Sequence, residues 1–180
     1  MKRDFVEEIK LPEKVKATLN GSELIIEGPK GRNSRVFDYK NVKLTLEDNK
    51  LTLKVENGNK RDKCMFYTYL AHIKNMIKGV TEGFTYKMKI ISGHFPISVS
   101  ISGDEFIVKN LFGEKKPRKL KLYPDVKVKV EGEYVVLEGI NKERVGQQAA
   151  NIEQLCRITT RDRRIFFDGI YIVEKSGKSV

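Results

Sequence analysis

The chain has 180 residues, of which 39% are hydrophobic and 33% are charged, so it can bury a core and is not intrinsically disordered. Its 35 lysines and arginines outnumber 24 aspartates and glutamates, which gives a net charge of +11 and a pI near 9.6. Such a charge attracts polyanions, so nucleic acid or an acidic membrane surface is the expected partner.

The first ten residues carry charges of both signs, which exclude the apolar region of a secretory signal. No apolar run approaches the roughly 20 residues of a membrane span. We therefore expect a cytoplasmic protein that does not enter a membrane. The basic excess is spread through both halves of the chain, so it is not a detachable tail.

The sequence repeats itself. The segment 19–26 (LNGSELII) is echoed by 101–108 (ISGDEFIV), with Gly31 and Gly113 at the same offset. Apolar and polar residues then alternate over 42–46 and again over 126–130, with the period of half-buried strands. A turn and a second strand follow in each copy, at 51–55 and 134–137, so both copies predict a hairpin.

A helix closes each copy. In the first, the apolar residues Phe66, Leu70, Ile73 and Ile77 are spaced as on one helical face, and Gly79 is expected to end the helix. In the second, Asn141 is expected to cap the N-terminus, and a similar stripe follows at Val145, Ala149, Ile152 and Cys156.

The predicted fold is therefore α+β, with two tandem duplicated lobes, each a small mainly antiparallel sheet packed against one helix. We expect the first lobe at residues 1–82 and the second at 83–180. The alternative is a single domain whose halves are similar by chance. It is disfavoured because strand, turn and helix recur in the same order.

Metal and catalytic motifs are not found. Cys64, Cys156, His72 and His94 are single and scattered, unlike the closely spaced ligands of a zinc site, so we expect no metal and no cofactor. Both cysteines fall in predicted helices and are expected to be reduced core residues. No serine, cysteine or lysine has a recognisable catalytic partner nearby, and we expect no enzyme.

The densest basic cluster follows Glu114. Because Pro117 opposes a helix, a charged loop is predicted for this segment. Its cations could contact phosphates, or the loop could simply be solvated. The basic residues are Lys115, Lys116, Arg118, Lys119 and Lys121.

A second cluster follows the second helix and comprises Arg157, Arg161, Arg163 and Arg164, with Lys175 and Lys178 in the tail. The intervening aromatics Phe166, Phe167 and Tyr171 could stack on unpaired bases. We favour a core role for this region, because Ile165, Phe167, Ile170 and Ile172 form a strand-like run. The first lobe lacks an equivalent arginine run, so the second lobe is expected to bind nucleic acid more strongly.

Four ordered motifs together closely resemble the family of the sixth large-subunit ribosomal protein, in its archaeal and eukaryotic form. They lie at residues 93–96 (GHFP), 110–118 (NLFGEKKPR), 145–153 (VGQQAANIE) and 161–171 (RDRRIFFDGIY). One small departure is Gln148, where the pattern leads us to expect threonine; a helix tolerates either residue.

The resemblance implies two duplicated lobes and an architectural function in the large ribosomal subunit. It implies binding to large-subunit ribosomal RNA, chiefly by the second lobe, near the sarcin–ricin loop and the stalk base. Neighbouring ribosomal proteins and translational GTPases would lie close by. Residues 115–121 and 157–164 become the leading RNA contacts, with His94, Lys175 and Lys178 as further ones.

Competing hypotheses predict different behaviour. A generic RNA-binding protein or RNA chaperone would bind without preferring a cognate fold. An enzyme would need a pocket of converging polar groups. A membrane-surface protein would need a helix with a strongly basic face and an aromatic insertion face, and neither predicted helix has this pattern.

Overall fold

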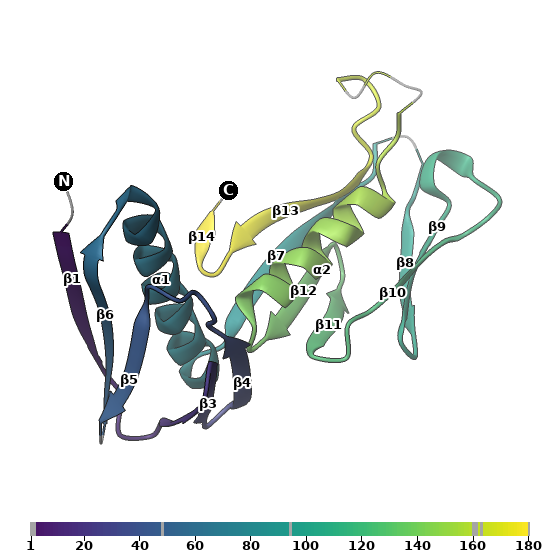
Figure 1. The fold of residues 1–180 in the computed structure, drawn as a ribbon. Helices are drawn as coiled ribbons and strands as arrows, with labels where there is room; N and C mark the ends of the chain where they lie inside the picture. Colours follow the sequence, from purple (N-terminus) through teal and green to yellow (C-terminus); the bar gives the residue numbers. More distant parts are fainter. Residues whose placement is uncertain (1–2, 48, 94, 160–161, 163, 180) are drawn as a thin grey trace. The chain divides into compact units, whose positions relative to one another are not determined.

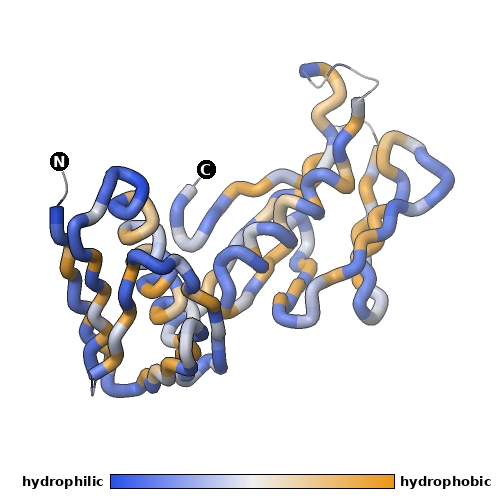
Figure 2. The backbone as a smooth tube through the Cα atoms, in the orientation of Figure 1, coloured by the Kyte–Doolittle hydropathy of each residue, from blue (hydrophilic) through white to orange (hydrophobic). Residues whose placement is uncertain are grey.

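The computed structural model describes residues 3–47, 49–93, 95–159, 162 and 164–179 (Figure 1). By its internal contacts the chain divides into two compact units, residues 1–83 and 84–180. Along the strands of both units hydrophobic and hydrophilic residues alternate (Figure 2). This alternation places one face of each strand in a core and leaves the other toward solvent.

Unit 1 contains two antiparallel three-stranded sheets and one helix. The sheet orders are β1-β6-β5 and β2-β3-β4. The elements are β1 (Arg3–Lys10), β2 (Lys16–Asn20), β3 (Glu23–Gly28), β4 (Gly31–Val36), β5 (Lys43–Glu47), β6 (Lys50–Gly58) and α1 (Lys60–Thr81).

Helix α1 supplies the centre of the unit 1 core. Phe66, Leu70 and Ile73 from the predicted stripe are buried, whereas Ile77 is only half-buried. The predicted hairpin is confirmed as β5 and β6, on which Leu51 and Leu53 are fully buried. One apolar stripe on the helix thus meets the apolar face of the hairpin.

The start of α1 is fixed by Asp62, in its first turn. The Asp62 carboxylate accepts hydrogen bonds from the Asn59 backbone N–H at 2.7 Å, from Asn41 at 2.9 Å and from the Tyr39 hydroxyl at 2.8 Å. These bonds, the Asn59 N–H first, hold the pKa of Asp62 below its ordinary value although the residue is buried. A negative charge in the first turn also interacts favourably with the positive end of the helix dipole.

The expected helix stop at Gly79 is wrong. The helix continues to Thr81, and Gly79 is buried within it. The stop is Gly83, whose φ of +76° is the left-handed conformation typical of a helix C-terminus, and whose N–H donates to the Lys78 carbonyl. Continuation of the helix buries Val80 completely, against Gly28 of β3.

Unit 2 follows the same order and adds two strands at its end. Its sheets have the orders β10-β9-β8 and β11-β12-β7-β13-β14. The elements are β7 (Phe84–Ile91), β8 (Ser98–Ser102), β9 (Glu105–Lys109), the 3₁₀ turn η1 (Leu111–Gly113), β10 (Arg118–Lys121), β11 (Val126–Glu131), β12 (Tyr134–Gly139), α2 (Lys142–Leu155), β13 (Gly169–Lys175) and β14 (Lys178–Ser179).

Helix α2 lies across the large sheet, over β7, β12 and β13 (Figure 1). Val145, Ala149 and Ile152 are fully buried against this sheet, as their spacing predicted. The predicted cap is confirmed, because the Asn141 side chain accepts from the N–H groups of Glu143 and Arg144. Gln148 is also buried, and its amide oxygen accepts the backbone N–H of Tyr123 at 3.0 Å.

The duplicated α+β fold is confirmed. Gly21 and Gly103, at φ of +61° and +58°, occupy equivalent two-residue turns, and β5–β6 has its counterpart in β11–β12.

The cysteine prediction holds in part. Both thiols are free and Cys156 is buried, but Cys64 is exposed, because it lies on the solvent face of α1.

Candidate nucleic-acid interface

Three of the motif segments meet at one end of unit 2, which we call the motif end. It comprises the described residues of 93–96, 110–118, 157–158 and 164–168. The Gly93 N–H donates to the Asp168 carboxylate at 2.7 Å, and the Asn110 amide donates to the Pro96 carbonyl at 3.0 Å. Segments separated by up to 75 residues are thereby joined.

The segment that enters η1 has an unusual backbone. Asn110, Phe112 and Gly113 have φ of 59°, 51° and 77°, a left-handed conformation that is rare outside glycine and asparagine. Buried Leu111 anchors the turn in the core, and the Phe112 ring meets the Phe166 ring edge to face, with centroids 5.9 Å apart. The ring contact therefore joins this turn, which Lys115 and Lys116 follow in the sequence, to the 164–168 segment.

Arg118 fastens this region internally. Its guanidinium donates from Nε at 2.8 Å and from Nη2 to the two carboxylate oxygens of Glu114. Its Nη1 donates to the carbonyls of Leu155 and Arg157, at 2.7 and 3.1 Å. Leu155 is the last residue of α2, where helix carbonyls need donors and the dipole favours a cation, and Arg157 follows the C-cap.

The bonds with Arg118 hold the pKa of Glu114 below its ordinary value.

The charged loop predicted from Lys115 to Lys121 is only partly correct. Residues Arg118–Lys121 form β10, which pairs with β9, and only the part before Arg118 is a loop. Pro117 does not prevent this strand, because it immediately precedes the first strand residue, Arg118.

The other cations of the motif end differ in their pairing. Among the described residues, Lys115, Lys116 and Arg157 are exposed and have no carboxylate at ion-pair distance. Arg164 is 90% exposed in its side chain and is held by Asp162 at 2.8 Å, which keeps the pKa of that carboxyl low through a side-chain hydrogen bond. Its other face remains open to solvent. Arg118 connects the loop of Lys115 and Lys116 to the Arg157 backbone, and the ring pair of Phe112 and Phe166 connects η1 to the segment that carries Arg164.

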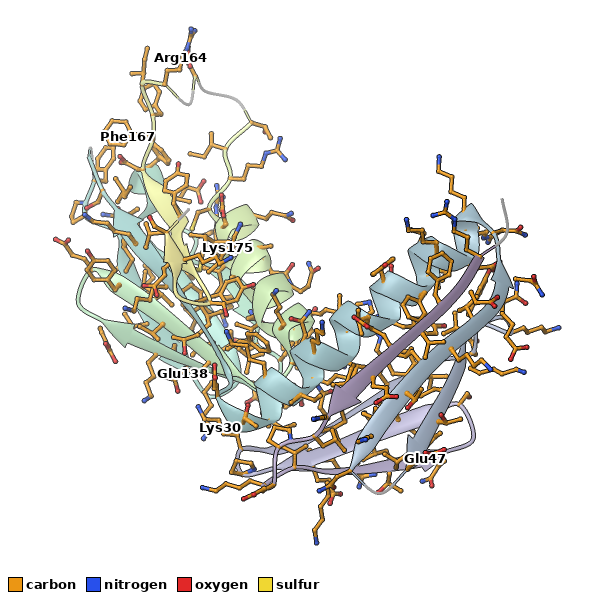
Figure 3. The ribbon with its side chains drawn as sticks, turned by 90° about the vertical axis from the view of Figure 1, so that its left-hand side faces the viewer. Lys30, Glu47, Glu138, Arg164, Phe167 and Lys175 are labelled. Carbon is orange, nitrogen blue, oxygen red and sulfur yellow. The ribbon has the colours of Figure 1, made fainter. Side chains whose placement is uncertain are left out.

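Some predicted contacts lie elsewhere. Lys119 is paired with Glu105 at 2.9 Å, and Lys121 lies exposed at the far end of β10. Lys175 and Lys178 pair across the β13–β14 hairpin. The register places Gly169 opposite Ile91 and Lys175 opposite Tyr86, so the tail lysines lie at the other end of β13 (Figure 3). His94, Arg161 and Arg163 lie outside the described residues.

The aromatic prediction needs correction. Ile165 and Phe167, expected in the core, are 59% and 46% exposed, whereas Ile170 is buried as expected. The reason is that β13 begins only at Gly169, so residues 165 and 167 precede the sheet. Buried Asp168 lies between the exposed residues 165–167 and the strand, and its carboxylate accepts the Gly93 N–H.

A hollow of about 390 Å³ lies between the end of α2 and the start of β13, lined among others by Arg157, Phe166, Asp168 and Cys156. Burial raises the pKa of the Cys156 thiol to about 11, so the thiol is protonated at neutral pH. No group of acidic, histidine and cysteine residues suited to a metal ion occurs in the described residues. Neither of the helices described is long and apolar enough to cross a membrane.

Sequence reasoning missed the residues that arrange the site. Glu114 and Asp168 lie inside the recognised motifs, but nothing marked them as the partners of Arg118 and Gly93. A signal existed for Glu114, because it precedes Arg118 by four residues. No local signal existed for Asp168, because its partner is distant in sequence.

Comparison with known proteins gives consistent matches along the chain. The family model described as Ribosomal protein L6 matches residues 11–83 and 95–169. The large ribosomal subunit protein uL6 of Methanosphaera stadtmanae is 49% identical over 173 residues, which is 96% of this chain and 94% of the relative. Those of Methanobrevibacter smithii and Saccharolobus solfataricus are 46% and 47% identical, over 94% of this chain and 95% and 94% of the relatives. The chain belongs to the ribosomal protein L6 family.

Proposed function

We propose that this protein is a structural constituent of the large ribosomal subunit in the cytoplasmic ribosome, where it binds ribosomal RNA chiefly through unit 2. Two findings support this assignment: the family membership, and the 46–49% identity over nearly the full chain to proteins named for the large ribosomal subunit. The role is architectural rather than enzymatic. Neighbouring ribosomal proteins are further partners.

The observation that carries the RNA contact is the charge arrangement at the motif end. Lys115, Lys116 and Arg157 have no internal ion pair among the described residues, and Arg164, which pairs with Asp162, is 90% exposed in its side chain. Cations left unpaired by their own fold neutralise phosphates and release counterions, a favourable entropic term that weakens with added salt. Arginine contributes a planar fork and lysine a point charge.

The proposed contacts differ in rank. Lys115, Lys116, Arg157 and Arg164 lead, with Arg161 and Arg163 as their sequence neighbours and His94 in the adjoining motif. Lys119, Lys121, Lys175 and Lys178 would contact more distant phosphates. We assign Arg118 chiefly to positioning the loop, because its guanidinium is engaged by Glu114 and the end of α2.

The finer proposal concerns location on the subunit. The motifs at 93–96, 110–118 and 161–171 resemble those of the family, which implies a site near the sarcin–ricin loop and the stalk base. A protein there would support the region where translational GTPases dock. Recognition of a folded RNA backbone, through phosphates and 2′-hydroxyls, is sufficient for this function.

The test is a binding measurement on the full chain across a salt series. One probe is a large-subunit RNA fragment that contains the sarcin–ricin region, and the other is an unrelated folded RNA of equal length. We expect a preference for the first that persists near physiological salt. Equal and steeply salt-dependent binding to both would instead identify a generic RNA-binding or RNA-chaperone protein.

Variants then connect the preference to the motif end. Replacing Arg161, Arg163 and Arg164 with alanine is expected to weaken binding and flatten its salt dependence without loss of helix content by circular dichroism. Unchanged affinity and salt dependence would remove this segment from the interface.

A further inference from the structure

Two phenylalanines at the motif end are placed unlike all others in the chain. All nine phenylalanines lie in the described residues, and only Phe95 and Phe167 are exposed, at 45% and 46%. Ile165, which is 59% exposed, belongs to the same segment as Phe167. Folding gains little from large apolar groups left in water, and a cluster of them indicates a contact surface.

Each of the two rings lies near a glycine of another motif segment. A Cβ atom at Gly93 would lie 3.2 Å from the Phe167 ring and 3.0 Å from the Asp168 carboxylate, so this ring lies close over the Gly93 backbone. A Cβ atom at Gly113 would lie 3.7 Å from the Phe95 ring. The Phe167 ring is therefore packed closely on the Gly93 backbone, and the Phe95 ring lies near Gly113 with room for an ordinary van der Waals contact.

The surroundings of the rings favour RNA over an apolar protein partner. The loop that carries Lys115 and Lys116 begins directly after Gly113, and Arg164 precedes Phe167 by three residues. Exposed cations beside fixed aromatic faces are the two components by which proteins bind unpaired nucleotides, phosphates on the first and bases on the second. A protein–protein interface would instead be depleted of lysine.

We propose that Phe95 and Phe167 stack on unpaired bases, so that the motif end recognises a loop or bulge of a folded RNA rather than a continuous duplex. This inference rests on the proposed function and names the RNA feature that the same site takes. The cations supply affinity that does not depend on RNA form. The two rings supply the preference for unstacked bases, which a regular helix does not offer.

The test uses the full chain and two forms of one large-subunit RNA fragment. In one form a loop is unpaired, and in the other a complementary strand pairs it. The key variant is Phe95→Leu/Phe167→Leu, which keeps apolar bulk and removes the aromatic faces. Phe95→Tyr/Phe167→Tyr keeps the faces, and Tyr134→Leu, which alters a 43% exposed aromatic residue of β12, is the matched control.

We expect the leucine variant to bind the unpaired form more weakly by about 5- to 160-fold for each base stack that is lost, with duplex binding and the salt dependence unchanged. The tyrosine variant and the control should bind as the wild type. A 2-aminopurine base in the loop should report stacking with wild type and not with the leucine variant.

Wild-type affinity of the leucine variant for the unpaired form would overturn the inference and leave the rings to a protein partner. Loss of binding that the tyrosine variant does not restore would also overturn it. Failure of the proposed function has a different signature, because the wild type would then not distinguish the ribosomal fragment from unrelated RNA.

Discussion

The role of Arg118 in fastening the motif end leads to a quantitative prediction. Replacement with alanine removes the pair of bonds to Glu114 and the two bonds to carbonyls at the end of α2. The ion pair is 25% and 40% exposed in its two side chains, so it contributes at most about 1 kcal/mol. The two carbonyl bonds add about 1 kcal/mol each. Arg118→Ala should therefore lower the free energy of unfolding by roughly 2–3 kcal/mol.

The assay is urea unfolding followed by circular dichroism, with Lys115→Ala/Lys116→Ala and Lys119→Ala as controls. The first control loses only exposed charges and the second also loses an exposed ion pair with Glu105, so both should stay within about 1 kcal/mol of the wild type. Glu114→Gln removes the ion pair but not the carbonyl bonds, so it should cost about 1 kcal/mol. If Arg118→Ala is as stable as the controls and loses RNA affinity as Lys115→Ala/Lys116→Ala does, Arg118 is a phosphate ligand and the reasoning is refuted.

Three further predictions follow from the packing. Asp62→Ala should lower the free energy of unfolding by about 1–2 kcal/mol in urea titrations. Because the pKa of Asp62 is lowered in the folded protein, the carboxylate stabilises the fold above the ordinary carboxyl pKa. This stabilisation is lost as pH falls through the lowered value. Equal stability of the two proteins at neutral pH would contradict this. A thiol reagent should modify Cys64 quickly in the native protein and Cys156 only after unfolding, since burial raises the Cys156 pKa to about 11; two fast thiols would show the packing to be wrong. Gly139→Ala places a Cβ atom 2.6 Å from a Val145 methyl group, and should cost about 1–3 kcal/mol by thermal or urea unfolding, unless the helix shifts freely.

Local patterns in the sequence were sufficient for much of the fold. Alternation over 42–46 and 126–130 gave both hairpins, and Asn141 gave the start of α2. The end of α1 could not be read locally. A glycine inside a helix costs about 1 kcal/mol, but continuing the helix past Gly79 buries Val80, a gain of about 1.5–3 kcal/mol. The contact that decides the balance comes from Gly28, far away in sequence.

The candidate site was only partly predictable for a related reason. Charge runs locate basic residues, but pairing decides which of them can meet a phosphate. Arg118 and Lys115 look alike in the sequence, and only the fold shows that Arg118 is engaged by Glu114 and the end of α2. Phe167 lies in an apolar run that looks like a strand. The strand begins only after Asp168, whose bond to Gly93 joins segments far apart in the sequence, so the local pattern does not reveal where the strand starts.

The central claim, that the motif end binds RNA phosphates, is tested most directly by the salt dependence of affinity for the large-subunit RNA fragment. Lys115→Ala/Lys116→Ala is compared with Lys127→Ala/Lys129→Ala, which removes the same charge from exposed residues of β11. We predict that the first variant loses a salt slope of roughly 0.7–0.9 for each phosphate contact, and that the second retains nearly the wild-type slope. Equal losses in the two variants would contradict the account, because the binding would then follow net charge and not the motif end.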